Sequence, residues 1–308
     1  MYLLRHLPEL ERFKEPVTVA MGVFDGVHLG HQAVIREAVR RARAIRGLGV
    51  VLTFHPHPAK ILRPEAAPSL LTTGQQDYEL FSALDADVCV ILDFTRQLSR
   101  QSATAFLDHI LKAIPRLRAI VVGPDWHFGH DRAGDFETLK TWAGHHHVQA
   151  VEVPLVCLQG EVISSTAIRN QVTAGRIALA NTRLGRPFQL VGRVIKGTGR
   201  GRKVGFPTAN LDVESEVVPA RGVYAARALC EGEVFAAAVN IGVRPTLIRS
   251  TQVVVEAHLL DFDDDLVGHH LRLDFLARLR DEQKFRNVRE LRRQIARDIL
   301  AARHLAHA

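Results

Sequence analysis

The sequence predicts an α/β protein in two parts: a doubly wound parallel sheet, then an antiparallel β-barrel with a C-terminal helix. Apolar strand-like runs alternate with helical patterns through residue 153. After residue 187, strand-like runs follow one another closely with no helical pattern between them. The chain then ends on a helical pattern at residues 287–305. These observations divide the chain into domains 1–186 and 187–308.

Composition limits the possible classes of protein. The chain has 308 residues, of which 47% are hydrophobic and 24% charged, so it is long enough for two folded cores. The net charge of +7 favours anionic ligands such as nucleotides. The three cysteines, Cys89, Cys157 and Cys230, are far apart and are typical of free thiols in a reducing compartment. Because no apolar run approaches the length of a membrane span, we expect a cytoplasmic protein that does not bind membranes.

The predicted elements of the first half alternate between strand and helix. After an opening strand at residues 19–21, the expected strands are residues 50–54, 88–92, 119–122 and 150–153, and the expected helices are residues 32–46, 77–84, 102–114 and 135–143. This order indicates about five parallel strands with crossover helices, and such sheets bind ligands beyond the carboxyl ends of their strands.

The first such end carries a glycine- and histidine-rich turn. Glycines allow the backbone to approach a ligand closely, and the free N–H groups of a helix start form an anion site. His28 and His31 are three residues apart, so both can project toward a bound phosphate. The alternative is a surface turn with two incidental histidines. The other candidate binding residues of this turn are Gly22, Phe24, Asp25 and Gly26.

Further loops follow later strands of the first half. The loop with Pro56 and Pro58, and the loop at residues 123–129, should meet the first turn at one edge of the sheet. A fourth stretch, at residues 163–169, follows the last strand and opens a helix. Its hydroxyl groups can either cap the helix or grip a phosphate, and it ends in an arginine. The candidate residues there are Ser164, Ser165, Thr166 and Arg169.

The second half has its own glycine-rich segment directly after a strand. Residues 196–205 combine glycines with cations, which suits a loop that wraps polyphosphate. A solvated hairpin or an RNA-binding loop would have the same composition. Thr208 and Asn210 follow at once and offer neutral oxygen ligands for Mg²⁺, although a turn with an asparagine is the alternative. The other candidate residues are Gly197, Gly199, Gly201, Lys203, Gly205 and Pro207.

With these motifs in order, the chain resembles the bacterial bifunctional riboflavin kinase and FAD synthetase over nearly its whole length. The motifs of the first half are FDGVHLGH, TFHPHP, VGPDWHFG and ISSTAIR. Those of the second half are GRKVGFPTAN, GVY, NIGVRPT and VEAHLLDF. The resemblance implies a nucleotidylyltransferase-like first domain of Rossmann type and a six-stranded second domain. The implied ligands are ATP, riboflavin, FMN, FAD and Mg²⁺, with no nucleic acid as partner.

The resemblance also implies roles for the candidate residues of the first domain. His28 and His31 would stabilise charge at the reacting phosphate of ATP, while Ser164 to Thr166 and Arg169 would hold the departing pyrophosphate. Pro56 and Pro58, with Phe106 and Phe128, would form the walls that receive the flavin, although both phenylalanines could equally be core. Asp125 is a further candidate binding residue, at a position where some members of the family carry Asn.

In the second domain the resemblance makes Thr208 and Asn210 the holders of Mg²⁺ and nucleotide phosphates. Glu256 would be the base that takes the proton from the ribityl hydroxyl. This residue interrupts an apolar strand, although a strand carboxylate can simply face solvent. Val23, Trp126 and Val267 depart from the usual family residues, and we expect these departures to alter affinity rather than activity.

Three other interpretations stay open at this stage. H-x-G-H also occurs in class I aminoacyl-tRNA synthetases, but the first half has no KMSKS-type lysine loop. A nucleic-acid-binding module would use the basic residues 196–203 and bind with strong salt dependence. A member of the family that has lost one activity is the third, and no motif supports it. The acidic run at 261–265 and the histidines at 145–147 are interpreted as solvated residues.

Overall fold

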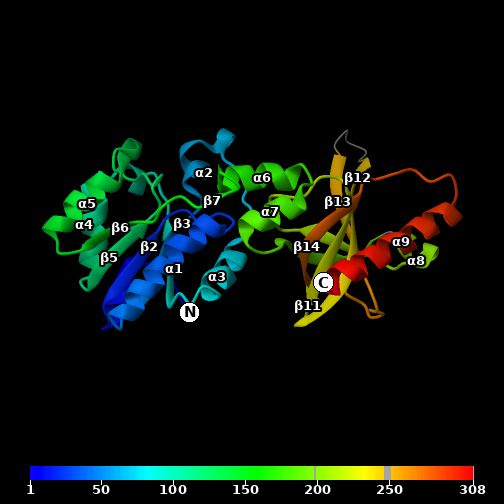
Figure 1. Ribbon diagram of the computed structural model, residues 1–308, viewed down its shortest axis with the longest axis horizontal. Helices are drawn as coiled ribbons and strands as arrows, with labels where there is room; N and C mark the ends of the chain where they lie inside the picture. Colours follow the sequence, from blue (N-terminus) through cyan, green and yellow to red (C-terminus); the bar gives the residue numbers. More distant parts are fainter. Residues whose placement is uncertain (198, 246–250, 308) are drawn as a thin grey trace. The chain divides into compact units, whose positions relative to one another are not determined.

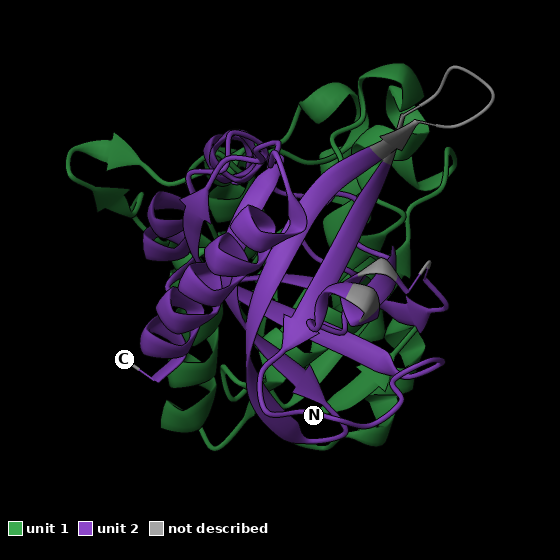
Figure 2. Ribbon diagram, turned by 90° about the vertical axis from the view of Figure 1, so that its right-hand side faces the viewer, with its two compact units in different colours: residues 1–69, 74–164 green, residues 70–73, 165–308 purple. Residues whose placement is uncertain are grey.

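The computed structural model describes residues 1–197, 199–245 and 251–307. These form two compact units (Figure 2). The first comprises Met1–Ser69 and Gly74–Ser164, and the second comprises Leu70–Thr73 and Ser165–Ala308. In the described residues, no helix combines the length and apolar character that a bilayer span requires.

The first unit is built on a six-stranded parallel sheet with the order β1-β4-β3-β2-β5-β6 (Figure 1). The predicted count of about five omitted β1, because three residues are too few to show a strand pattern. β2 lies near the centre of the sheet, and all of its residues are buried. The strands are β1 Tyr2–Leu4, β2 Val17–Met21, β3 Leu48–His55, β4 Val88–Asp93, β5 Leu117–Val122 and β6 Gln149–Glu152.

Helices cover both faces of this sheet, which confirms the doubly wound prediction. Side chains alternate between the faces along each strand: Val19 and Met21 pack with α4 Ala103–Ala113 and α5 Phe136–His145, whereas Ala20 packs with α1 Leu29–Ala44 and α3 Gly74–Ser82. The remaining short elements of the unit are η1 Leu7–Arg12, α2 Pro58–Leu62, η2 Pro64–Ala66, η3 Leu98–Arg100, η4 His130–Arg132 and the hairpin β7 Cys157–Leu158 and β8 Glu161–Val162.

The second unit is a closed antiparallel barrel with the strand order β10-β13-β12-β11-β14-β9. Alternate residues such as Val239, Ile241, Val255 and Ala257 fill its interior. β10 is the strand that the sequence pattern did not indicate, because it is short and follows the glycine-rich segment. The strands are β9 Phe188–Ile195, β10 Ala209–Val213, β11 Gly222–Cys230, β12 Glu233–Pro245, β13 Thr251–Leu259 and β14 His270–Arg280.

The helices described in the second unit are α6 Ser165–Thr173, α7 Ile177–Leu184, α8 Arg200–Val204 and α9 Val288–His307. α7 packs against β14 and β9, and α9 packs against β11, β12 and β14. Asn181 of α7 donates from Nδ2 to the Phe275 carbonyl at 2.8 Å and accepts from the Phe188 N–H at 2.8 Å. The side chain of one helix therefore satisfies backbone groups of two strands.

Candidate active sites

Three of the predicted loops lie at one edge of the parallel sheet. β3, β2 and β5 are neighbours in the sheet and run parallel, so their carboxyl ends lie side by side. The turn from Gly22 to His28 follows β2, Pro56 follows β3, and Gly123 follows β5. The structure therefore brings these three loops together, as sheet topology predicts.

The two histidines form a stacked pair at the start of α1. His28 is the N-cap residue, and its Nδ1 accepts a hydrogen bond from the backbone N–H of His31 at 3.3 Å. The two rings lie 3.6 Å apart with an angle of 21° between their planes. Because Nδ1 of His28 is an acceptor, the proton of a neutral His28 ring lies on Nε2. That nitrogen is then a hydrogen-bond donor.

His31 differs from His28 in its electrostatic environment. Burial, with a smaller contribution from His28, holds the pKa of His31 well below its usual value. His31 is therefore neutral at physiological pH. Its Nδ1 is buried and has no hydrogen-bond partner in the described part of the chain. A buried polar atom without a partner is costly, so this nitrogen is suited to a ligand atom.

Phe24, Phe81 and Gln32 support this pair from behind. The ring of Phe24 makes edge contacts with His31 at 5.4 Å and with Phe81 at 5.9 Å. Gln32 donates from Nε2 to the Val27 carbonyl at 2.9 Å and so holds the turn. Sequence reasoning missed Phe81 and Gln32, because neither belongs to a chemical motif and their role depends on packing.

Aromatic side chains gather beside the loop that follows β5. Trp126 stacks on Phe128 with ring centroids 4.1 Å apart, and Phe128 lies 6.3 Å from Phe106. Phe106 and Phe128 are 6% and 7% exposed and belong to the hydrophobic core, whereas Trp126 is only partly buried. The two phenylalanines are therefore core residues, and Trp126 is the member of this group that solvent reaches. Asp125 beside it is exposed.

The fourth predicted stretch divides between the two units. Ser164 ends the first unit, and Ser165 begins α6 in the second. The helix start is therefore where the sequence predicts it. Thr166 is exposed and Arg169 is half-buried.

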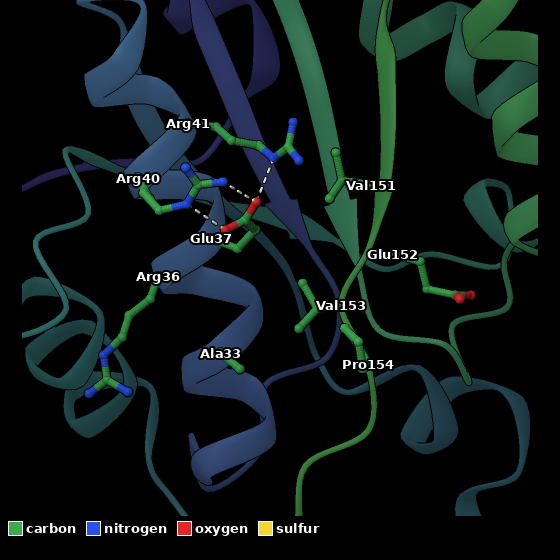
Figure 3. Close-up of a pocket in the computed structure, with 9 residues that line it drawn as sticks. All are labelled: Ala33, Arg36, Glu37, Arg40, Arg41, Val151, Glu152, Val153 and Pro154. Atoms are coloured by element: carbon green, nitrogen blue, oxygen red, sulfur yellow. Dashed lines mark hydrogen bonds and ion pairs between the residues drawn. The ribbon is translucent and has the colours of Figure 1, made fainter.

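A pocket of about 360 Å³ lies between α1 and the end of β6 (Figure 3). Arg40 and Arg41 both turn toward Glu37, with nitrogen to oxygen distances of 2.8 and 2.7 Å, whereas Arg36 points away from it. The hydrogen bonds from Arg40 and Arg41 lower the pKa of Glu37 to about 2. This pocket contains none of the predicted site residues, and Glu37 in it is paired with Arg40 and Arg41.

In the barrel, three polar residues occupy one row across adjacent strands. Asn210 of β10 pairs with Glu256 of β13, and Glu256 pairs with Asn240 of β12. Since Val255 and Ala257 point into the barrel, Glu256 and its two neighbours lie on the outer face. Opposite residues have Cβ atoms about 5 Å apart, so the carboxylate lies between two amides. The sequence indicated Asn210 and Glu256 but not Asn240.

The glycine-rich segment lies against this row. A Cβ atom on Gly197 would come within 2.2 Å of Nδ2 of Asn210, so only glycine allows this approach. The segment is attached at two further points: Nδ1 of His258 donates to the Pro207 carbonyl at 2.6 Å, and Nε of Arg292 donates to the Val204 carbonyl at 3.0 Å.

The remaining candidate residues of this segment lie around α8. Thr208 is half-buried beside Gly201, where a Cβ atom would lie 2.9 Å from its Oγ1. Gly199 and Gly205 flank α8 with positive φ angles of 69° and 91°. The side chain of Lys203 lies outside the described part of the structure.

Comparison with known proteins identifies the family of each half of the chain. Residues 10–167 match the family model of FAD synthetase, and residues 184–306 match that of riboflavin kinase. The chain belongs to the bifunctional riboflavin kinase/FMN adenylyltransferase family. Proteins of that name from Pseudomonas fluorescens and Bacillus subtilis (strain 168) are each 36% identical to it, over 99% and 95% of this chain and 98% and 93% of theirs. The chain is therefore an enzyme with both activities.

The structural comparison agrees over the full length. The crystal structure of a protein from Streptococcus pneumoniae, described as a macrolide-efflux protein, matches with a TM-score of 0.87 and 28% sequence identity. The match covers 98% of this chain and 99% of that one. The predicted order of a parallel sheet and a six-stranded barrel is thus confirmed.

Proposed function

We propose that the turn between β2 and α1 carries out adenylyl transfer and that the row around Glu256 carries out phosphorylation. The enzyme phosphorylates riboflavin to FMN and joins FMN to the adenylyl group of ATP, with release of pyrophosphate. The observation that carries the first assignment is the buried Nδ1 of His31 at a helix start, without a partner among the described residues. The corresponding functional domains would be residues 1–186 and 187–308, in a cytoplasmic protein.

In adenylyl transfer, the chain's part is positioning and charge stabilisation, so no covalent nucleophile is needed. An oxygen of FMN phosphate attacks the α-phosphorus of ATP, and the bond to pyrophosphate breaks. His28 and neutral His31 donate hydrogen bonds to the phosphate oxygens, where negative charge gathers, together with the first N–H groups of α1. By the family resemblance, the departing pyrophosphate is held by Ser164, Ser165, Thr166 and Arg169. In the first unit, Pro56, Pro58 and Trp126 face the flavin.

In phosphorylation, Glu256 accepts the proton of the terminal ribityl hydroxyl as its oxygen attacks the γ-phosphorus of ATP. Thr208 and Asn210 would hold Mg²⁺, which neutralises phosphate charge when bound. Their side chains fit this ion, because both offer neutral oxygens and the Asn210 amide lies against the glycine-rich segment at Gly197. Asn240, on the other side of Glu256, helps to orient its carboxylate.

Two variants test the assignment on the full-length protein incubated with ATP and Mg²⁺. We expect His31→Ala to convert riboflavin to FMN normally but to form FAD at least about 100-fold more slowly, since charge stabilisation of this kind contributes that much. Glu256→Gln should show the reverse, with FAD formed normally from added FMN. Chromatography of the flavins measures both steps.

Each variant also serves as the folding control of the other, because one activity of each stays intact. Loss of both activities in a folded His31→Ala protein would refute the separation into two sites. Kinase activity retained by Glu256→Gln would refute its role as base.

A further inference from the structure

Gly242 and Glu282 form an unassigned feature of the outer barrel face. Gly242 lies on β12 two residues beyond Asn240, on the same side of the strand, because Ile241 between them points into the barrel. A Cβ atom on Gly242 would come within 2.5 Å of Oε1 of Glu282 and 3.6 Å of Nδ2 of Asn240. The carboxylate of Glu282 therefore lies over Gly242, beside the amide of Asn240.

Within the described residues, Glu282 differs from the neighbouring carboxylates, which are paired. Asp281 next to it pairs with Arg278 at 2.6 Å, and Asp298 pairs with Arg280 at 2.7 Å. Glu282 is exposed and makes no hydrogen bond or ion pair with any residue that the structure describes. With respect to the described residues, both oxygens can therefore accept hydrogen bonds from a ligand.

The polar row around Glu256 lies on the same face. Asn210, which is 8% exposed, lies opposite Glu256 in this row. Its amide, the Glu256 carboxylate and the Asn240 amide form one polar row across three strands, which suits a ligand rich in polar groups. Glu282 and Asn240 lie at the opposite side of Glu256 from Asn210.

We propose that Glu282 is a substrate-binding residue that accepts hydrogen bonds from the ribityl hydroxyls of riboflavin. This inference rests on the proposed role of Glu256. A carboxylate only accepts and a hydroxyl donates, whereas a carboxylate repels the phosphates of ATP, so this side of Glu256 suits the polyol rather than the nucleotide. Gly242 keeps open the surface on which the carboxylate and the polyol meet.

The test measures the kinase reaction of the full-length protein with each substrate varied in turn. We expect Glu282→Ala to raise KM for riboflavin about tenfold, as the loss of one hydrogen bond to a charged group does. KM for ATP and kcat should change less than about threefold on the same scale. Glu282→Gln should recover part of the affinity, since its amide oxygen still accepts.

A second ligand tests the chemistry of recognition. Lumiflavin carries a methyl group where riboflavin carries the ribityl chain, so it lacks the hydroxyls. As a competitive inhibitor it should bind the wild type and Glu282→Ala equally well. Weaker binding of lumiflavin to the variant would show that Glu282 acts on the ring or on the fold, and would overturn the proposal.

Gly242→Ala provides a matched variant, because its new methyl group displaces only the end of a flexible side chain. It should raise KM for riboflavin as Glu282→Ala does, and the double variant should show no further increase. Glu233→Ala, which removes another exposed glutamate at the start of β12, is the control and should behave as wild type. Conversion of FMN to FAD confirms the integrity of each protein.

An unchanged KM for riboflavin in Glu282→Ala overturns the inference, and so does an equal rise in both KM values. Failure of the underlying assignment has a different signature, since Glu256→Gln would then retain kinase activity.

Discussion

Gly30 is the residue on which the geometry of the histidine pair depends. Its Cα lies beside the ring of His28, and a Cβ atom there would come 3.1 Å from Cε1 and 3.2 Å from Nδ1 of that ring. These contacts are tighter than ordinary van der Waals contacts, so the ring would have to shift. The hydrogen bond from His31 to Nδ1 is already 3.3 Å long and would be lost first.

We therefore expect Gly30→Ala to lower the rate of FAD formation about tenfold while FMN formation is unchanged. Stability should change by less than about 1 kcal/mol, since alanine is the better helix former. Gly144→Ala is the matched control: it lies in α5 with no atom within 4 Å of the new methyl group, so only stability should rise. FAD synthesis by Gly30→Ala at the wild-type rate would contradict this account.

The candidate residues differ in how far sequence could reveal them. His28, His31 and Glu256 were found because they are reactive side chains in motifs or interrupt an apolar strand. Glu282 carries no such signal: it is one exposed glutamate in a polar segment, more than twenty residues from Glu256. Because Gly242 has no side chain, the carboxylate of Glu282 can lie on the outer barrel face that also carries Glu256.

Among the elements, α9 is joined to β14 by a buried ion pair. Arg280 of β14 donates to both carboxylate oxygens of Asp298, and Gln294 donates to Oδ1 of the same residue at 2.9 Å. Asp298 is 6% exposed. Removal of one partner would leave the guanidinium without its counter-charge in a largely buried position.

Asp298→Ala should therefore lower the free energy of unfolding of the second unit by about 3 kcal/mol. Denaturant unfolding monitored by circular dichroism measures the effect. Arg303→Ala is the comparison, because its pair with Asp261 is solvent-exposed and should contribute less than about 1 kcal/mol. Equal effects of the two substitutions would show that burial of the Arg280 pair is energetically unimportant.

Most helices and strands were predictable, because the spacing of apolar residues along the sequence reflects which face of each element is buried. β12 and β13 show apolar residues at every second position, and α9 has one apolar stripe. β1 and β10 were missed for a physical reason: β1 has three residues and β10 has five, so neither contains enough alternation to be recognised. β1 and β10 are held in place by pairing with longer strands: β1 with β4, and β10 with β9 and β13.

At the scale of the molecule, the boundary between the compact units differs from the sequence boundary near residue 187, where alternating strand and helix patterns give way to successive strand patterns. α6 and α7 belong to the second unit, and so do Leu70–Thr73, although these four residues lie early in the chain. Leu71 is 1% exposed, and the Leu70 N–H donates to a carboxylate oxygen of Glu216 at 2.9 Å. The sequence patterns show where the parallel sheet ends and the antiparallel barrel begins. The boundaries of the compact units depend also on which helices and loops pack against each sheet.

This division predicts the stability of fragments. A fragment of residues 165–308 keeps α7 and both hydrogen bonds of Asn181 to the barrel strands. A fragment of residues 187–308 loses them and exposes the surface of β14 and β9 against which α7 packs. The longer fragment should be more stable by at least about 2 kcal/mol, since two hydrogen bonds contribute about 1 kcal/mol each before apolar burial is added. The full-length protein should exceed both in the unfolding of its barrel, because it also buries Leu71. Urea unfolding of the three proteins measures this order, and equal stability of the two fragments would assign α7 to the first unit instead.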